Sequence, residues 1–135
     1  MSKSAADFAL DLHKFGEMTD KKLLNIVIKI TLDLDRSVVL GTPVDTGRAR
    51  GNWFPSVGSP SSEVNQNASD KSGAATLGKI EEVVGKVQIG NIVWLSNNLP
   101  YIVPLENGHS KQAPSGMVDI NMSRVQAKYG GSVTR

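Results

Sequence analysis

The sequence predicts an α+β fold in a single domain of residues 1–135, in which a long helix in the N-terminal half packs on a small antiparallel sheet. Apolar residues recur at helical spacing over 20–40, and residues favoured in strands gather in short segments further along the chain. A chain of 135 residues is long enough for one hydrophobic core. Further short helices and a long mobile loop complete the predicted fold.

The principal helix is predicted over 20–40, where apolar residues recur at steps of three and four. Thr19 or Asp20 can cap its first amides, and Gly41 followed by Thr42-Pro43 is an end signal. A second apolar set makes the apolar surface wider than one stripe. Either the helix is sandwiched inside its own domain, or part of this surface meets a neighbouring subunit. The first set is Leu23, Val27, Ile30, Leu34 and Val38, and the second is Leu24, Ile28, Leu32 and Val39.

Two short elements and a loop are predicted around this helix. Apolar spacing indicates an amphipathic helix over 5–15, and Trp53 and Phe54 indicate a strand over 49–57 that ends at Pro55 or slightly beyond it. The segment 56–72 is rich in serine and contains no aromatic residue, so we expect a long mobile loop that becomes ordered on assembly.

The second half of the chain contains three further predicted elements. A helix is expected over 74–84, after a cap at Asp70 or Ser72. The β-rich segment 86–97 is expected to form a hairpin or a strand, with Gly90-Asn91 as its turn, and 116–129 is expected to form the C-terminal helix.

Composition argues against several classes of site. The chain has no cysteine, and His13 and His109 lie 96 positions apart, so thiolate chemistry is excluded and a histidine zinc site is not expected. No segment is apolar enough to span a bilayer, and the polar N-terminus does not resemble a secretory signal. The formal net charge is +2, but lysines and arginines are scattered along the sequence, so no phosphate-binding stripe stands out.

Asp45-Thr46-Gly47 matches the tripeptide with which dimeric aspartic proteases bring two carboxylates together. In that mechanism the Asp ends an apolar strand, whereas here a long helix and a Pro43-Val44 turn precede it, and Arg48 favours an ionised carboxylate. We therefore favour a turn in which Asp45 accepts backbone amides, Gly47 reverses the chain, and Arg48 and Arg50 face outward or pair with acids. A protease-like dimer using Asp45 is kept as an alternative.

Glu106 and His109-Ser110 suggest a hydrolase or a metal site only superficially. Residues this close in sequence rarely form the line of nucleophile, base and orienting acid, and no further ligands of the right type lie nearby. A helix that ends at Asn107-Gly108 is the favoured interpretation.

Several of these turns recur together in one family of proteins. The sequence resembles the minor tail component, or tail-completion, family of long-tailed bacteriophages, whose members pair a long helix ending in a Pro-Val-Asp-Thr-Gly-Arg turn with a later Tyr and Glu-x-Gly block. The resemblance spans about Leu23 to Met117, although the serine-rich segment 56–72 is longer than in the shortest members. The blocks that carry it are Thr42-Pro43-Val44-Asp45-Thr46-Gly47-Arg48, Asn52-Trp53, Asn97-Asn98-Leu99-Pro100-Tyr101, Leu105-Glu106-Asn107-Gly108-His109-Ser110 and Gln112-Ala113-Pro114-Ser115-Gly116-Met117.

The resemblance implies an α+β subunit that forms a ring, of six copies, at the neck between the head connector and the tail tube, with viral DNA passing through the ring without sequence-specific binding. Its partners would be further copies of the chain, a tail terminator or tail tube protein, and a head-tail connector or stopper protein. Such a protein would reside in the virion, after assembly in the host cytoplasm. The resemblance implies no catalytic residue, no cofactor and no metal.

We predict that the motif blocks make polar contacts at an intersubunit or inter-ring surface, because binding residues concentrate on irregular loops. In the alternative, both blocks only stabilise their own fold. A third possible function is a small DNA-binding accessory protein. The predicted interface residues are Asp45, Thr46, Gly47, Arg48, Arg50, Trp53, Tyr101, Glu106, Gly108, His109 and Ser110.

Overall fold

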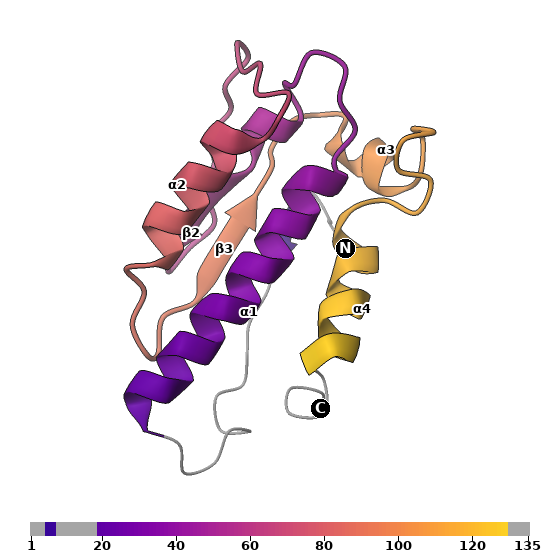
Figure 1. Ribbon diagram of the computed structural model, residues 1–135. Coiled ribbons are helices and arrows are strands. Elements are labelled where there is room, and N and C mark those ends of the chain that lie inside the picture. Colours follow the sequence, from indigo (N-terminus) through magenta and orange to yellow (C-terminus); the bar gives the residue numbers. More distant parts are fainter. Residues whose placement is uncertain (1–4, 8–18, 130–135) are drawn as a thin grey trace.

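The computed structural model is an α+β fold, as the sequence predicts (Figure 1). It describes residues 5–7 and 19–129. Along the chain the elements are β1 (Ala5–Asp7), α1 (Asp20–Gly41), the 3₁₀ helix η2 (Arg50–Asn52), β2 (Phe54–Val57), α2 (Ala74–Val84), β3 (Val93–Ser96), α3 (Ile102–Glu106) and α4 (Val118–Tyr129).

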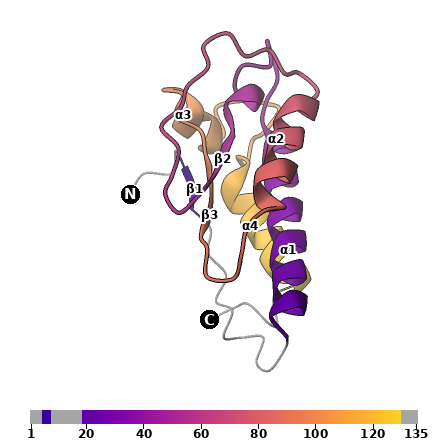
Figure 2. The same cartoon turned by 90° about the vertical axis from the view of Figure 1, so that its left-hand side faces the viewer.

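The main helices and the sheet form two layers (Figures 1 and 2). α1 crosses the sheet between α2 on one side and α4 on the other, and it contacts both helices. α2 also packs on β2. The two helices and the sheet therefore cover much of the apolar surface of α1, which favours the first of the two explanations, although one face of the helix stays open to solvent.

α1 confirms the helix predicted over 20–40 and gains one residue at its C-terminal end. The Thr19 hydroxyl accepts a hydrogen bond from the Lys22 amide at 3.3 Å, which caps the helix as predicted. Leu34 and Val38 are fully buried, and burial of such a side chain stabilises the fold by about 1.5–3 kcal/mol. Within 19–129, no helix is both long and apolar enough to cross a bilayer. The half-buried members of the second apolar set that pack against the core are Leu24, Ile28 and Leu32.

The sheet has the strand order β1-β3-β2, and both pairings are antiparallel. Leu95 lies opposite Ala6 on one side and Pro55 on the other, so β3 is the central strand. β2 is an edge strand, and an edge position tolerates a proline because no ladder bond is needed from its nitrogen. Val93 and Leu95 of β3 are buried, whereas Ile92 just before the strand is exposed.

Two predicted elements differ from the structure. Ala5–Asp7 is a strand paired with β3, so the helix predicted over 5–15 is wrong there, because sheet pairing overrides a short local pattern; residues 8–15 lie outside the described residues. The strand predicted over 49–57 begins only at Phe54, because Arg50–Asn52 forms η2. The segment 86–97, predicted as a hairpin or a strand, forms one strand, β3, and no hairpin.

The missing hairpin has a local cause. The Asn91 amide donates to the Gln88 carbonyl at 3.0 Å, and the Asn91 side chain accepts from the Gln88 amide at 2.8 Å. The turn at 88–91 therefore joins the end of α2 to β3 and does not join two strands. Val87, which the prediction placed in the first strand, is instead buried in the core just after α2.

The segment between β2 and α2 contains no helix or strand from Gly58 to Gly73, and most of its side chains are exposed. Hydrogen bonds fix it to the body at a few points. The Asn98 side-chain amide donates to the carbonyls of Ser61 and Glu63 at 2.8 and 3.1 Å. The mobility expected for this segment stays a prediction.

Candidate functional site

The motif blocks converge at one end of the molecule, where the C-terminal end of α1 lies near α3 (Figure 1). Gln112 joins two blocks: its side chain donates to the Val44 carbonyl at 2.9 Å and accepts from the Val44 amide at 2.8 Å. The buried Asn97 side chain donates to the Ala49 carbonyl at 2.9 Å. Loops that are far apart in the sequence are therefore joined by side-chain amides.

Arg50 closes the C-terminal end of α1. Its guanidinium donates to the carbonyls of Leu40 at 2.8 Å and Thr42 at 3.1 and 3.2 Å, and also to Lys71 at 2.7 Å. The last carbonyls of a helix have no intrahelical partner, and a cation there also complements the helix dipole. Arg50 was predicted to face outward or to pair with an acid, and the structure corrects this: its partners are backbone carbonyls.

Thr42 and Trp53 form a second connection at the same place. The Thr42 hydroxyl donates to the Val38 carbonyl at 2.7 Å and accepts from the Trp53 indole nitrogen at 2.8 Å. Trp53 is 1% exposed, and its one polar atom is satisfied. Trp53 is therefore part of the core of the single chain.

The turn after α1 packs closely on the serine-rich segment. Gly47 has φ +87°, and a Cβ there would lie 2.6 Å from the Lys71 backbone nitrogen, so only glycine fits. The Thr46 hydroxyl accepts the Arg48 amide at 3.3 Å, a role that was predicted for Asp45. Asp45 itself is exposed.

Asn52 attaches the serine-rich segment from the other side of the turn. Its side chain donates to the Asn65 carbonyl at 2.9 Å and accepts the Asn65 amide at 2.8 Å. The Asn65 backbone therefore forms with this side chain the two hydrogen bonds that it would otherwise form with a neighbouring strand. Asn52 is fully buried, whereas Asn65 is exposed. Within the motif Asn52-Trp53, Asn52 therefore holds the serine-rich segment in place, and Trp53 packs in the core.

Glu106 caps α4. Its carboxylate accepts the amides of Met117 and Val118, both at 2.8 Å, and of Asp119 at 3.0 Å. The side chain is buried, and a carboxylate at a helix N-terminus satisfies unpaired amides and complements the helix dipole. Glu106 therefore stabilises the chain's own framework, which is the second of the two roles considered for it.

Gly108 completes the helix end that was predicted at Asn107-Gly108. Its φ is +86°, and a Cβ there would lie 2.4 Å from the Pro114 carbonyl oxygen. The loop 107–117 therefore folds back on itself, and His109 and Ser110 lie on its outer part. The His109 side chain is exposed, and Ser110 is half-exposed.

Five predicted interface residues come together in an open groove of about 380 Å³ between the α1–η2 loop, α3 and the loop that follows it. The Arg48 guanidinium lies over the Tyr101 ring, 5.6 Å from its centroid, and it donates to the side-chain oxygen of Gln66. Its Nε atom is buried and has no hydrogen-bond partner among the described residues. The five residues are Asp45, Thr46, Arg48, Tyr101 and Ser110.

The predicted interface set therefore divides into two groups. Gly47, Arg50, Trp53, Glu106 and Gly108 build the scaffold, whereas the five groove residues present side chains to solvent. His109 is exposed but does not line the groove. Three scaffold residues were not predicted, although all three stand in the motif blocks: Asn52, Asn97 and Gln112.

The described residues do not have the geometry of a protease site at Asp45 or of a hydrolase or metal site at Glu106. Asp45 lies in an exposed loop, whereas the protease mechanism needs an Asp at the end of an apolar strand. Both oxygens of Glu106 already accept amides. Among the described residues, no group of three histidines or acids could share a metal ion.

Two acids of α1 have perturbed pKa values. Burial raises the pKa of Asp35 to about 7, and its Oδ2 atom has no hydrogen-bond partner among the described residues. Burial opposes ionisation of Asp33 as well, but hydrogen bonds from Arg124, Lys128 and Tyr129 outweigh it and lower its pKa to about 2. Asp33 is therefore ionised at neutral pH, and its ion pairs with Arg124 and Lys128 join α4 to α1.

Comparisons with known proteins identify no relative of the chain. No protein-family model matches it, and neither a curated protein nor a solved structure matches it significantly. The fold and the groove are therefore the physical basis for a functional proposal.

Proposed function

We propose that the protein is a structural subunit of a tailed bacteriophage, a tail-completion or neck subunit that forms a ring joining the tail to the head connector, with DNA passing through. The proposal follows the resemblance of the motif blocks to that family. The ring would contain six copies and meet a tail terminator or tail tube protein on one side and a connector or stopper protein on the other.

The observation that carries the proposal is the division of the motif residues into a scaffold and a groove. Arg50, Glu106 and Gln112 fix three loops with bonds of 2.7 to 3.2 Å, and these loops present the groove residues. A preorganised set of side chains loses less entropy on association than a flexible one does. Such a division fits a binding surface better than loops that serve only their own fold.

The groove is suited to polar contacts with another protein. Arg48 offers a planar cation stacked on Tyr101, and Asp45 offers an exposed acid in the same groove. Arg and Tyr are enriched among the residues that dominate binding energy at interfaces. A carboxylate from a neighbouring chain could pair with the accessible part of the Arg48 guanidinium.

The proposal is tested by Arg48→Ala and Tyr101→Ala, with Lys111→Ala as an exposed control outside the groove. We expect the two groove variants to lower the yield of joined heads and tails at least tenfold while changing the melting temperature of the isolated subunit little. The control should leave the yield unchanged. Normal yield from both groove variants would contradict the assembly role of the groove.

A further inference from the structure

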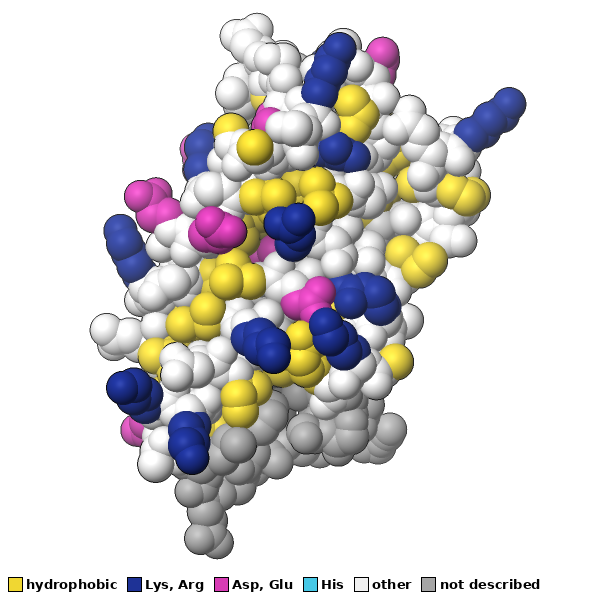
Figure 3. Space-filling view, in the orientation of Figure 1, with side chains coloured by type: hydrophobic (Ala, Val, Ile, Leu, Met, Phe, Trp, Pro, Cys, Tyr) yellow, Lys and Arg dark blue, Asp and Glu magenta, His cyan; other side chains and the backbone are white. Residues whose placement is uncertain are grey.

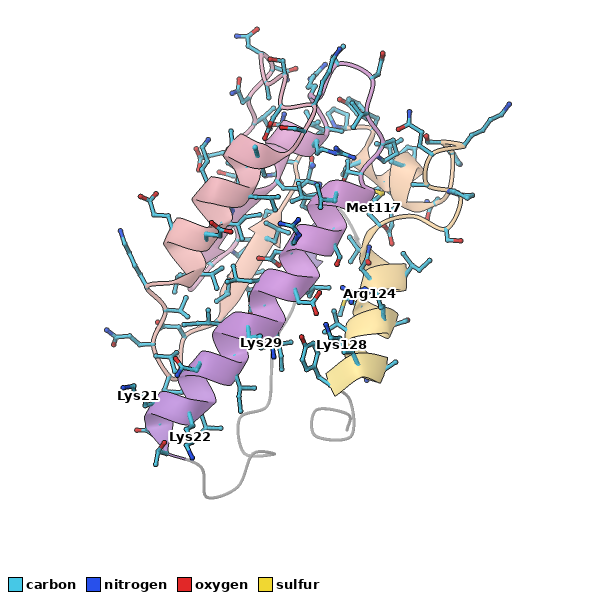
Figure 4. All side chains as sticks on the ribbon, viewed as in Figure 1. Lys21, Lys22, Lys29, Met117, Arg124 and Lys128 are labelled. Atoms are coloured by element: carbon cyan, nitrogen blue, oxygen red, sulfur yellow. The ribbon has the colours of Figure 1, made fainter. Side chains whose placement is uncertain are left out.

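Cations that are scattered along the sequence gather on one face of the folded chain. α1 and α4 lie side by side, and Figure 3 shows Lys and Arg side chains over both helices on this face. Figure 4 labels five of them. The exposed cations of the two helices are Lys21, Lys22, Lys29 and Arg36 on α1 and Arg124 and Lys128 on α4.

Three of the α1 cations form a regular row. Lys22, Lys29 and Arg36 are seven residues apart, which is about two helical turns, so their side chains leave the same side of the helix. At about 1.5 Å per residue, the row is roughly 21 Å long. This length corresponds to about six base-pair steps of a duplex at about 3.4 Å each.

Acids on the two helices do not neutralise this face. The acids are Asp20, Asp33, Asp35 and Asp119, and Asp35 is buried. Asp33 is already paired with Arg124 at 2.8 Å and Lys128 at 3.1 Å. Within 19–129, no ion pair involves the α1 cations.

We infer that this α1–α4 face binds the phosphate backbone of double-stranded nucleic acid without reading its sequence. A duplex carries one negative charge about every 1.7 Å, and a row of cations on a straight helix can follow it by releasing counterions. A regular row of cations matches the repeating phosphates, and phosphate contacts carry no sequence information directly.

The inference extends the proposed function by assigning the surface that meets the DNA. That the face points into the lumen of a ring rests on the proposed function, whereas binding of duplex by the isolated subunit does not. The ring and the binding of duplex by the isolated subunit can therefore be tested separately. If the protein is not found in the neck, only the proposed ring is contradicted. If the isolated subunit does not bind duplex, only this inference is contradicted.

The test measures the affinity of the full-length chain for a short duplex of random sequence at several salt concentrations. The three phosphate contacts of the row contribute about −2.7 to the slope of log affinity against log salt, or roughly a 40-fold loss between about 50 and 200 mM. In the triple variant Lys22→Gln, Lys29→Gln, Arg36→Gln, we expect at least tenfold weaker binding and a slope that is shallower by about 2.7. Each single variant should reduce the slope by about 1.

A matched control removes the same charge from exposed lysines outside the face, with Lys71→Gln, Lys86→Gln and Lys111→Gln. We expect its affinity to stay within about twofold of the parent. Equal losses in the two triple variants would overturn the inference, because net charge alone would then explain binding. Binding to vesicles that contain phosphatidylserine, with no binding to duplex, would also overturn it and would identify the face as a membrane surface.

Discussion

The carboxylate of Glu106 lies directly against Gly116. A Cβ at Gly116 would lie 2.9 Å from Oε1 of Glu106 and 2.3 Å from its carbonyl oxygen, and Gly116 has φ +79°. Because a side chain is excluded there, Glu106 can reach the amides of Met117, Val118 and Asp119. The close approach of Glu106 and Gly116 therefore brings the two ends of the loop 107–117 together and allows Glu106 to cap α4.

Glu106→Ala should destabilise the isolated subunit by about 3 kcal/mol, because three amides lose their acceptor in a buried place. Glu106→Gln keeps one acceptor oxygen and should cost less. Chemical denaturation of the two variants and the parent measures the difference. A loss below about 0.5 kcal/mol in the alanine variant would show that Glu106 is free for contacts outside the chain.

Gly116→Ala should also destabilise the subunit, by roughly 2–4 kcal/mol, through its positive φ and the close approach to Glu106. The control is Gly78→Ala in α2, where an added Cβ meets nothing within 4 Å. Helix propensity predicts that this control gains about 1 kcal/mol. Opposite signs at the two glycines are the expected result, and a stabilising Gly116→Ala would contradict the geometry.

Arg50→Ala should cost about 2–3 kcal/mol, because the carbonyls of Leu40, Thr42 and Lys71 lose a charged donor together. Arg50→Lys should recover only part of this, since one ammonium cannot reproduce the planar fork. Thermal unfolding measures both variants. Arg36→Ala, an exposed change on α1, is the control and should lie within about 0.5 kcal/mol of the parent.

Asp35 should make stability fall as the pH rises. Its pKa is about 7 in the folded chain and near 3.8 when unfolded, so between these values the folded state binds the extra proton. Its contribution is complete below pH 3.8 and is lost as the pH rises to about 7, for a total of roughly 4 kcal/mol. Asp35→Asn should remove this dependence, measured as the stability difference from the parent between pH 4 and 8. A difference that does not change with pH would contradict it.

The serine-rich segment should exchange its amide hydrogens quickly in the free subunit, except near its attachment to Asn52. Among the described residues, no amide from 59 to 64 donates to a backbone carbonyl, whereas the Asn65 amide donates to the Asn52 side chain. Hydrogen exchange should therefore show protection at Asn65 that disappears in Asn52→Ala. Strong protection throughout 59–64 in the free subunit would show that the loop is already ordered.

Local sequence signals predicted α1, α2 and α4 well, but they predicted a helix where β1 lies and predicted the contacts between segments poorly. Apolar periodicity and caps placed α1 and α4 to within two residues and α2 at its observed bounds, because these signals act within a few residues. Arg50 was misassigned because its acceptors come from two separate segments. The amides that Glu106 caps lie 11 to 13 residues away, beyond any local pattern.

The basic face could have been found from the sequence. Along the chain the cations are scattered. Lys22, Lys29 and Arg36 nevertheless repeat every seven residues within a predicted helix, and this spacing places them on one side of it. The contribution of α4 could not be anticipated, because it depends on the packing of α4 beside α1.

Imaging of the neck in intact particles tests the central proposal most directly. The protein, located by its fold or by a fused label, should form a closed ring of six copies between head and tail. The groove of Arg48 and Tyr101 should face a neighbouring chain or an adjacent ring, as expected for an assembly contact. A single copy in the neck, or none, would contradict the proposed function.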